Sequence, residues 1–139
     1  EGLRVIACAF RESQGAESIG ELKDLIFVGL YGLIDALRPE VFQAMVKARE
    51  AGMRVVMITG DHPATALAVS RELGLAAEGS GALTGSELER MDEEALQSRV
   101  AGTAVYARVS AEHKLRIVRA WRAEGAVVAM AQTNDRAIF

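Results

Sequence analysis

Three consecutive residues, Thr59, Gly60 and Asp61, place a hydroxyl, a glycine and a carboxylate directly after a short apolar run. Pro63 then stands where a helix is predicted to begin, because proline is favoured at the first helical position. Glycine lets the backbone approach an anion closely, and a helix N-terminus offers it free N–H groups. The pattern predicts a phosphate site at the end of a sheet. An ordinary strand-to-helix turn, with Asp61 or His62 as the helix cap, is the alternative.

Further polar residues follow the other predicted strands. Lys114 can act as a point charge on phosphate oxygens, and Asn134 with Asp135 can supply hard oxygen ligands to magnesium. The other polar residues in equivalent positions are Asp35, Arg38, Arg108, Ser110 and Thr133. Each alone also fits a plain structural role, as a solvated lysine, a chain tail or a turn cap. In combination and in this order they indicate a phosphate-binding α/β domain.

The elements that must position these residues can be predicted from hydrophobic patterning. Strands are expected at residues 3–10, 25–30, 54–58, 104–107 and 127–130. The run at 25–30 is apolar throughout, which predicts a strand that is buried on both faces. Helices are expected from Pro39 to Gly52, from Pro63 to Gly74, from residue 92 to 100 and from Ser110 to Gly125, with a short helix capped by Thr84 and Glu87.

This order of elements predicts an α/β fold with a doubly wound, mainly parallel sheet. Parallel strands joined by helical crossovers place their C-terminal ends on one edge, where ligands bind in such sheets. We therefore expect Thr59-Gly60-Asp61 to end a central strand and to share one edge with Asp35, Lys114 and Asn134. His62 and His113 are expected to be exposed at helix starts.

Composition excludes several classes of function. The chain has 139 residues and a net charge of −3, with no basic field that would hold nucleic acid or an anionic membrane. Its single cysteine, Cys8, excludes an internal disulfide and a cysteine zinc cluster. No apolar run approaches the roughly 20 residues of a membrane helix. Both ends fall in mid-pattern, so we expect the chain to be a piece of a longer protein.

Three segments, "GLIDALRPEV", "MITGDHPATA" and "YARVSAEHKLRIV", resemble the P-type cation-transporting ATPases in their order and spacing. The branch that holds calcium pumps and sodium/potassium pumps is the most similar. The resemblance implies a haloacid dehalogenase-like, Rossmann-like phosphorylation domain that is incomplete here. Residues 1–23 would be the tail of the nucleotide-binding domain and hinge, and residues 24–139 the C-terminal part of the phosphorylation domain.

The resemblance also implies a role for each candidate residue. Thr59, Gly60 and Lys114 would contact the transferred phosphoryl group. Asp61 and Arg108 would face the nucleotide, with Asp35 and Arg38 in the hinge beside it. Asn134 and Asp135 would support the phosphoryl group and magnesium. The parent protein would use ATP and Mg²⁺, and this chain would be a cytoplasmic domain of an integral membrane protein, without direct membrane contact.

The sequence departs from that family at three places. The family's hinge reads Asp-Pro-Pro-Arg, whereas residues 35–38 read Asp-Ala-Leu-Arg. The last loop, at residues 131–135, is shorter and lacks the family's first aspartate, the principal magnesium ligand. No Asp-Lys-Thr-Gly-Thr segment is present, so the phosphorylated aspartate is absent, and the isolated chain is predicted to be inactive. These departures keep a second hypothesis open: a non-catalytic domain that binds a nucleotide or a protein partner.

Overall fold

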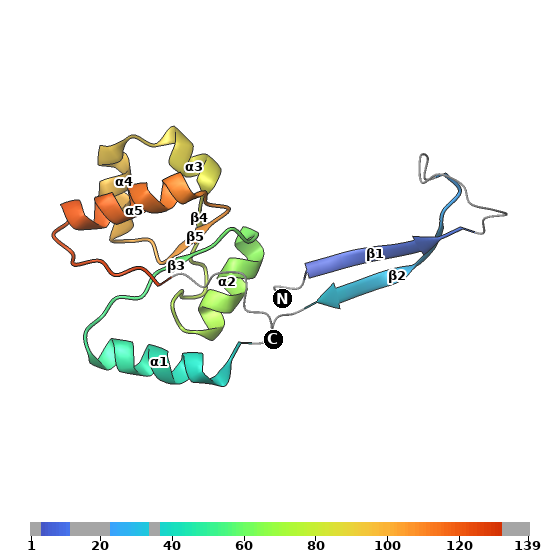
Figure 1. Cartoon of the computed structure of the whole chain (residues 1–139), viewed down its shortest axis with the longest axis horizontal. Helices are drawn as coiled ribbons and strands as arrows, with labels where there is room; N and C mark the ends of the chain where they lie inside the picture. The colour runs from blue at the N-terminus through green and yellow to red at the C-terminus, as the bar shows by residue number, and fades with distance from the viewer. Residues whose placement is uncertain (1–3, 12–22, 34–36, 132–139) are drawn as a thin grey trace.

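The computed structural model describes residues 4–11, 23–33 and 37–131. These residues form an α/β body and a hairpin that projects from it (Figure 1). The hairpin consists of β1 (Arg4–Phe10) and β2 (Ile26–Leu33), and the chain then enters α1 (Pro39–Glu50). The candidate residues Asp35, Asn134 and Asp135 lie outside the described residues, as do Thr133 and the first half of the expected hinge, residues 35 and 36.

The α/β body contains a three-stranded parallel sheet in the order β3-β5-β4. Its strands are β3 (Met57–Ile58), β4 (Leu83–Thr84) and β5 (Val105–Ala107). The helices are α2 (Pro63–Glu72), α3 (Gly85–Arg90), α4 (Glu93–Val100) and α5 (Ala111–Ala123). The parallel sheet and its helices confirm the predicted α/β fold class.

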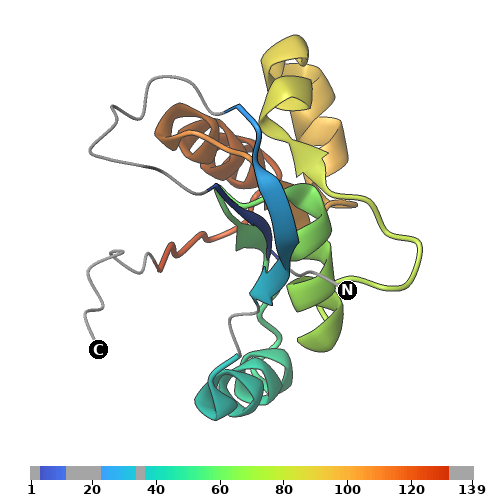
Figure 2. The same ribbon diagram turned by 90° about the vertical axis from the view of Figure 1, so that its right-hand side faces the viewer.

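Helices cover both faces of β5, because its side chains alternate between two clusters of the core. Val105 and Ala107 pack with Ala66 of α2 on one face. Tyr106 points to the other face, where it joins residues of α3, α4 and α5 such as Leu88, Leu96 and Ile117. All three residues of β5 are completely buried, so β5 is the central strand of the described sheet. Figure 2 shows the two layers of helices from the side of the hairpin.

The helix boundaries agree closely with the sequence prediction, because local capping chemistry sets them. Asp92 caps α4 through its side chain, which accepts a hydrogen bond from Ala95 N at 2.8 Å. Gly52, Gly74 and Gly125 follow α1, α2 and α5 with φ values of 69°, 65° and 83°, in the left-handed region that glycine adopts without a steric cost.

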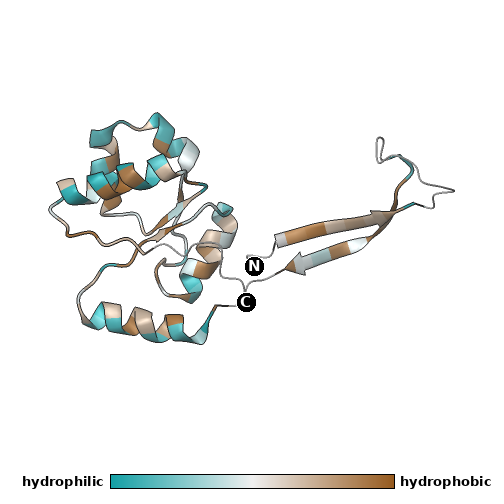
Figure 3. Cartoon of the chain, viewed as in Figure 1, coloured by the Kyte–Doolittle hydropathy of each residue, from teal (hydrophilic) through white to brown (hydrophobic). Residues whose placement is uncertain are grey.

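The predicted strands at 25–30 and 127–130 differ from the structure. Residues 25–30 do not join the parallel sheet; β2 pairs antiparallel with β1, and no helix formed by the described residues covers the pair. Phe27, Val28 and Leu30 are therefore 64%, 59% and 64% exposed instead of buried. Residues 126–131 form no strand, because no neighbouring strand among the described residues pairs with them. Hydrophobic residues, in brown, recur along both strands of the hairpin in Figure 3.

Candidate functional site

The loops after β3 and β5 are joined by direct backbone hydrogen bonds at the C-terminal edge of the sheet. Ile58 lies beside Tyr106 in the parallel register, and Thr59 N donates to Tyr106 O at 2.9 Å. Beyond the strands, Arg108 N donates to Asp61 O at 3.1 Å, and Val109 N donates to Thr59 O at 3.2 Å. The Thr59-Gly60-Asp61 loop and the Arg108 loop therefore form one continuous edge. β3 is an edge strand of the described sheet, not a central one as expected.

The Thr59 side chain closes a small ring with Asp61. Its hydroxyl donates to Asp61 Oδ2 at 2.8 Å and accepts from Asp61 N at 3.1 Å. The cap of α2 is His62, whose Nδ1 accepts from Ala64 N at 3.3 Å. The helix cap thus comes from His62, and the Asp61 carboxylate stays within the loop. A ligand that accepts a hydrogen bond from the Thr59 hydroxyl must therefore replace the Asp61 carboxylate as the acceptor.

Gly60 faces open space. It is exposed, and a Cβ added to it would meet no heavy atom of the described residues within 4 Å. Its backbone is also outside the left-handed region, so neither its conformation nor its packing against the described residues requires glycine here. The open space is what an anion would need in order to approach the backbone closely.

Arg108 has a backbone φ of 54°, in the left-handed region that a residue other than glycine seldom adopts. Such a conformation persists only where its neighbours hold it, and here the hydrogen bond to Asp61 O is one of the restraints. The guanidinium is on an exposed residue at the edge, where it can meet an anion. A strained, held backbone beside a candidate ligand position is typical of functional sites.

Lys114 lies in the first turn of α5, which starts immediately after the β5 loop. Ser110 caps the helix and accepts from His113 N at 3.3 Å, and Lys114 N donates to Ser110 O at 3.2 Å. His113 is 8% exposed, so the expectation that it is exposed is wrong. Its Nδ1 accepts from Ser110 N at 3.2 Å, and its Nε2 lies 3.7 Å from Glu89 Oε1. The imidazole is buried because it completes this cap.

The loop after β4 reaches the same edge, which the sequence interpretation missed. Because β4 is parallel to β5, its last residue, Thr84, lies beside Ala107. Thr84 and Glu87 form the predicted capping box: Thr84 N donates to Glu87 Oε2 at 2.8 Å, and Glu87 N donates to Thr84 Oγ1 at 3.3 Å. The Thr84 hydroxyl also donates to Glu87 Oε2 at 2.6 Å, and this hydrogen bond first and the one from Thr84 N second lower the pKa of Glu87. Gly85, between them, is buried against Arg108 and His113.

Arg38 lies at the start of α1. It stands at the N-cap position of α1 without a side-chain cap bond. Within the described residues no hydrogen bond or ion pair joins it to the edge. The hydrogen bonds of the described residues therefore join the Thr59-Gly60-Asp61 loop to Arg108 and Val109, shortly before α5, and they do not include Arg38.

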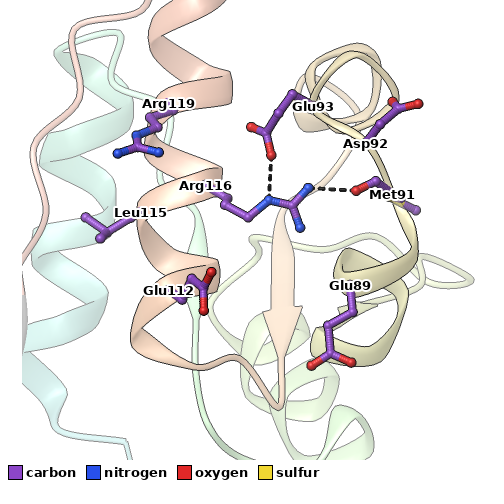
Figure 4. Close-up of a pocket in the computed structure, with 8 residues that line it drawn as sticks. All are labelled: Glu89, Met91, Asp92, Glu93, Glu112, Leu115, Arg116 and Arg119. Carbon is purple, nitrogen blue, oxygen red and sulfur yellow. Dashed lines mark hydrogen bonds and ion pairs between the residues drawn. The ribbon is translucent and has the colours of Figure 1, made fainter.

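A separate groove lies between α5 and the connection from α3 to α4 (Figure 4). Its lining residues are Glu89, Met91, Asp92, Glu93, Glu112, Leu115, Arg116 and Arg119. Arg116 spans it: the guanidinium donates to Leu88 O and Met91 O, both at 2.7 Å, and to Glu93 Oε1 at 2.6 Å. Arg116 thereby holds α5 against the other two helices.

Among the described residues, no three His, Cys, Asp or Glu side chains cluster in a way that would hold a metal ion. Within the same residues, none of the helices combines the length and apolarity that crossing a bilayer requires.

Comparison with known proteins shows the family to which the chain belongs. The family model for haloacid dehalogenase-like hydrolases matches residues 9–132, and the chain belongs to this family. Among individual proteins it is similar to calcium-transporting ATPase 1 of Lactococcus lactis, with 42% identity over 133 residues, and to the calcium-transporting ATPase of Bacillus subtilis, with 44% over 133 residues. Calcium-transporting ATPase type 2C member 2 of Rattus norvegicus is 42% identical over 129 residues.

These alignments cover 93–94% of this chain but only 13–15% of the relatives. The resemblance to cation-transporting ATPases is confirmed at the level of sequence similarity. The chain spans a small part of the length of the relatives that it matches.

Proposed function

We propose that this chain is part of the phosphorylation domain of an ATP-driven cation pump. The observation that carries the proposal is the hydrogen-bonded edge, where Asp61 O accepts from Arg108 N and Thr59 O accepts from Val109 N. Two separate loops thus bring a hydroxyl, an open glycine and two cationic residues to one end of the sheet. The similarity to calcium-transporting ATPases supports this assignment and favours calcium as the transported ion.

Each residue of the edge has a proposed role toward the phosphoryl group. Gly60 leaves room for its oxygens, and the Thr59 hydroxyl donates to one of them once it leaves Asp61. Lys114 neutralises charge that develops during transfer, which is commonly the largest contribution to such catalysis. Arg108 and Asp61 face the nucleotide, with Asp35 and Arg38 toward the hinge, and Asn134 with Asp135 supports Mg²⁺ and the phosphoryl group.

The proposed reaction in the parent protein transfers the γ-phosphoryl group of ATP to an aspartate and then hydrolyses the acyl phosphate. Covalent catalysis of this kind divides one difficult step into two easier steps. The nucleophile must be a carboxylate that lies in line with the phosphorus, at a distance of about 3–3.5 Å. None of the chain's aspartates is followed by Lys-Thr-Gly-Thr, so we assign the nucleophile to a part of the pump outside this sequence.

The hairpin favours a domain boundary later in the chain than the expected one at residue 23. β1 and β2 are exposed on both faces, as expected for strands that continue into the sheet of a neighbouring domain. The expected boundary at residue 23 separates these two paired strands. We therefore propose that both belong to the nucleotide-binding side and that residues 35–38 are the hinge.

The altered residues at 35–38 and 131–135 favour a second candidate function. Without the two hinge prolines of the resembled family, and with one fewer carboxylate in the last loop, the domain could bind a nucleotide or a protein partner without catalysis.

The experiment that separates the two candidates begins with the complete open reading frame. The pump proposal predicts an upstream Asp-Lys-Thr-Gly-Thr segment and membrane helices. It also predicts an acid-stable, hydroxylamine-sensitive label from ATP on the complete protein, which Lys114→Ala strongly reduces. The 139-residue chain alone should give no such label. A reading frame that starts near Glu1 would contradict the pump proposal and favour the second candidate.

A further inference from the structure

Gly85 occupies a position where no side chain fits. It is the first residue of α3, directly after β4, and it is buried. A Cβ added to it would lie 2.2 Å from the carbonyl oxygen of Arg108 and 3.1 Å from Cε1 and Nδ1 of His113. The nearest of these atoms belongs to the backbone, which cannot rotate away as a side chain can. The Gly85 backbone is not left-handed, so the requirement for glycine comes from space alone.

Arg108 is held on both sides of its left-handed backbone. Its N–H donates to Asp61 O, and its carbonyl oxygen lies against Gly85. A Cβ at Gly85 would push that carbonyl and rotate the peptide that follows Arg108. That peptide also carries the N–H of Val109, which donates to Thr59 O at 3.2 Å, so the movement would strain this hydrogen bond and reach the Thr59-Gly60-Asp61 loop.

The other contact of Gly85 reaches the start of α5. His113 is buried, and its Nδ1 accepts a hydrogen bond from Ser110 N at 3.2 Å. Lys114 is the next residue, so a shift of the imidazole moves the turn that carries the Lys114 amine. Gly85 therefore touches both ends of residues 108–114, the segment that supplies two of the proposed ligand contacts.

We infer that Gly85, together with His113, is a positioning residue of the candidate phosphate site. The inference rests on the proposed function of the edge. By lacking a Cβ, Gly85 lets β4 approach closely enough to fix Arg108, and His113 transmits the same contact to Lys114. Neither residue contacts the phosphoryl group.

The first arm of the test needs no ligand. Amide spectra of the ¹⁵N-labelled chain are compared for wild type, Gly85→Ala and the matched control Gly81→Ala, whose new Cβ would meet nothing within 4 Å. Gly85→Ala should shift the amides of Asp61, Arg108 and Lys114, whereas Gly81→Ala should leave them in place. A folded Gly85→Ala chain with wild-type signals at these residues would overturn the inference.

The second arm titrates the same chains with inorganic phosphate at a temperature where all are folded. We expect Gly85→Ala to weaken binding about tenfold or more, since small displacements in such sites have large effects. Leu96→Ala, which opens a cavity in the core at a completely buried residue, should lower the melting temperature and leave phosphate affinity unchanged. A Gly85→Ala chain that binds phosphate as Leu96→Ala does would contradict a positioning role.

The inference can still be tested if Gly85→Ala does not fold or if the chain binds no phosphate. If Gly85→Ala does not fold, His113→Ala replaces it: we expect shifts at Ser110 and Lys114 and several-fold weaker phosphate binding, and unchanged values would overturn the inference. If the wild-type chain binds no phosphate, the proposed function is contradicted, and the ligand-free amide shifts still decide whether Gly85 positions residues 108–114.

Discussion

Gly60 and Gly85 are glycines for different reasons. Gly85 is closely surrounded by protein atoms, whereas Gly60 faces open space. A requirement for glycine at position 60 would therefore come from a ligand and not from the fold. This contrast separates effects on binding from effects on folding.

Gly60→Ala should leave the free energy of unfolding within about 0.5 kcal/mol of wild type, because the new methyl group contacts nothing. Phosphate binding should nevertheless weaken, since the methyl group occupies the space from which an anion approaches the backbone. Urea unfolding and a phosphate titration on the same sample measure both effects. Unchanged phosphate affinity would exclude Gly60 from the site.

Glu87 gives the capping box a defined pH dependence. Its hydrogen bonds from Thr84 lower its pKa in the folded state, so they stabilise the fold above the ordinary glutamate range of about 4.3. This contribution is lost as the pH falls through the lowered pKa, because the unfolded chain takes up the proton first.

Glu87→Gln should thus destabilise the chain by about 1 kcal/mol at neutral pH, and the difference from wild type should shrink below about pH 4. Urea unfolding at a series of pH values measures it. Glu94→Gln, at an exposed position in the first turn of α4, is the control and should show a smaller difference. A Glu87→Gln difference that grows as the pH falls would refute the assignment.

At the scale of the elements, Arg116 joins three helices. Its guanidinium satisfies the carbonyls of Leu88 and Met91, which end α3, and pairs with Glu93 at the start of α4. Hydrogen bonds to a charged group contribute about 1.5–3 kcal/mol each when they are well shielded. The side chain of Arg116 is only 19% exposed, so its hydrogen bonds keep part of this stabilising contribution.

Arg116→Met should lower the free energy of unfolding by about 2–3 kcal/mol, because two helix-terminal carbonyls lose their partner. Chemical denaturation measures the loss. Arg119→Ala, three residues along the same groove and exposed, should cost less than about 0.5 kcal/mol. Equal effects of the two substitutions would show that Arg116 does not hold the helices together.

The helices could be predicted from the sequence because their ends depend on local chemistry. Asp92, Ser110 and the Thr84–Glu87 capping box act within three or four residues of the chain. The strands were less predictable, because an apolar run such as 25–30 does not reveal which strand it will pair with. Phe27 and Val28 fit a buried parallel strand as well as an exposed hairpin.

The candidate site was predictable only in part, for the same reason. Thr59-Gly60-Asp61 and Arg108 directly follow strands, so the topology of a parallel sheet was enough to predict that they lie at the same edge. Gly85 and the buried imidazole of His113 could not be found from local patterns, because their contact joins residues that are distant in the chain. The one available signal was a glycine at the start of a helix, where it is unfavourable for helix formation.

At the scale of the whole molecule, the hairpin and the α/β body are distinct. Figure 1 shows the hairpin projecting away from the helices. Its exposed large apolar residues are Val5, Ile6, Phe10, Ile26, Phe27, Val28, Leu30, Tyr31 and Leu33. Exposed apolar residues on an uncovered pair of strands favour association with other chains.

A chain limited to residues 37–139 should therefore keep the fold of the α/β body and associate less with itself than the full chain. Circular dichroism melting should give a similar midpoint, and size-exclusion chromatography should show a smaller associated fraction. A truncated chain that loses its helical signal would show instead that the hairpin is part of the core.

The central claim is that the edge formed by the β3 and β5 loops and the first turn of α5 binds a phosphoryl group. Its most direct test is a phosphate titration of the ¹⁵N-labelled chain. We predict saturable shifts at Gly60, Asp61 and Lys114 with an affinity no tighter than about millimolar, roughly 4 kcal/mol, and their loss in Lys114→Ala. Shifts that are identical in Lys114→Ala, or that gather around Arg116 and Arg119, would contradict the claim.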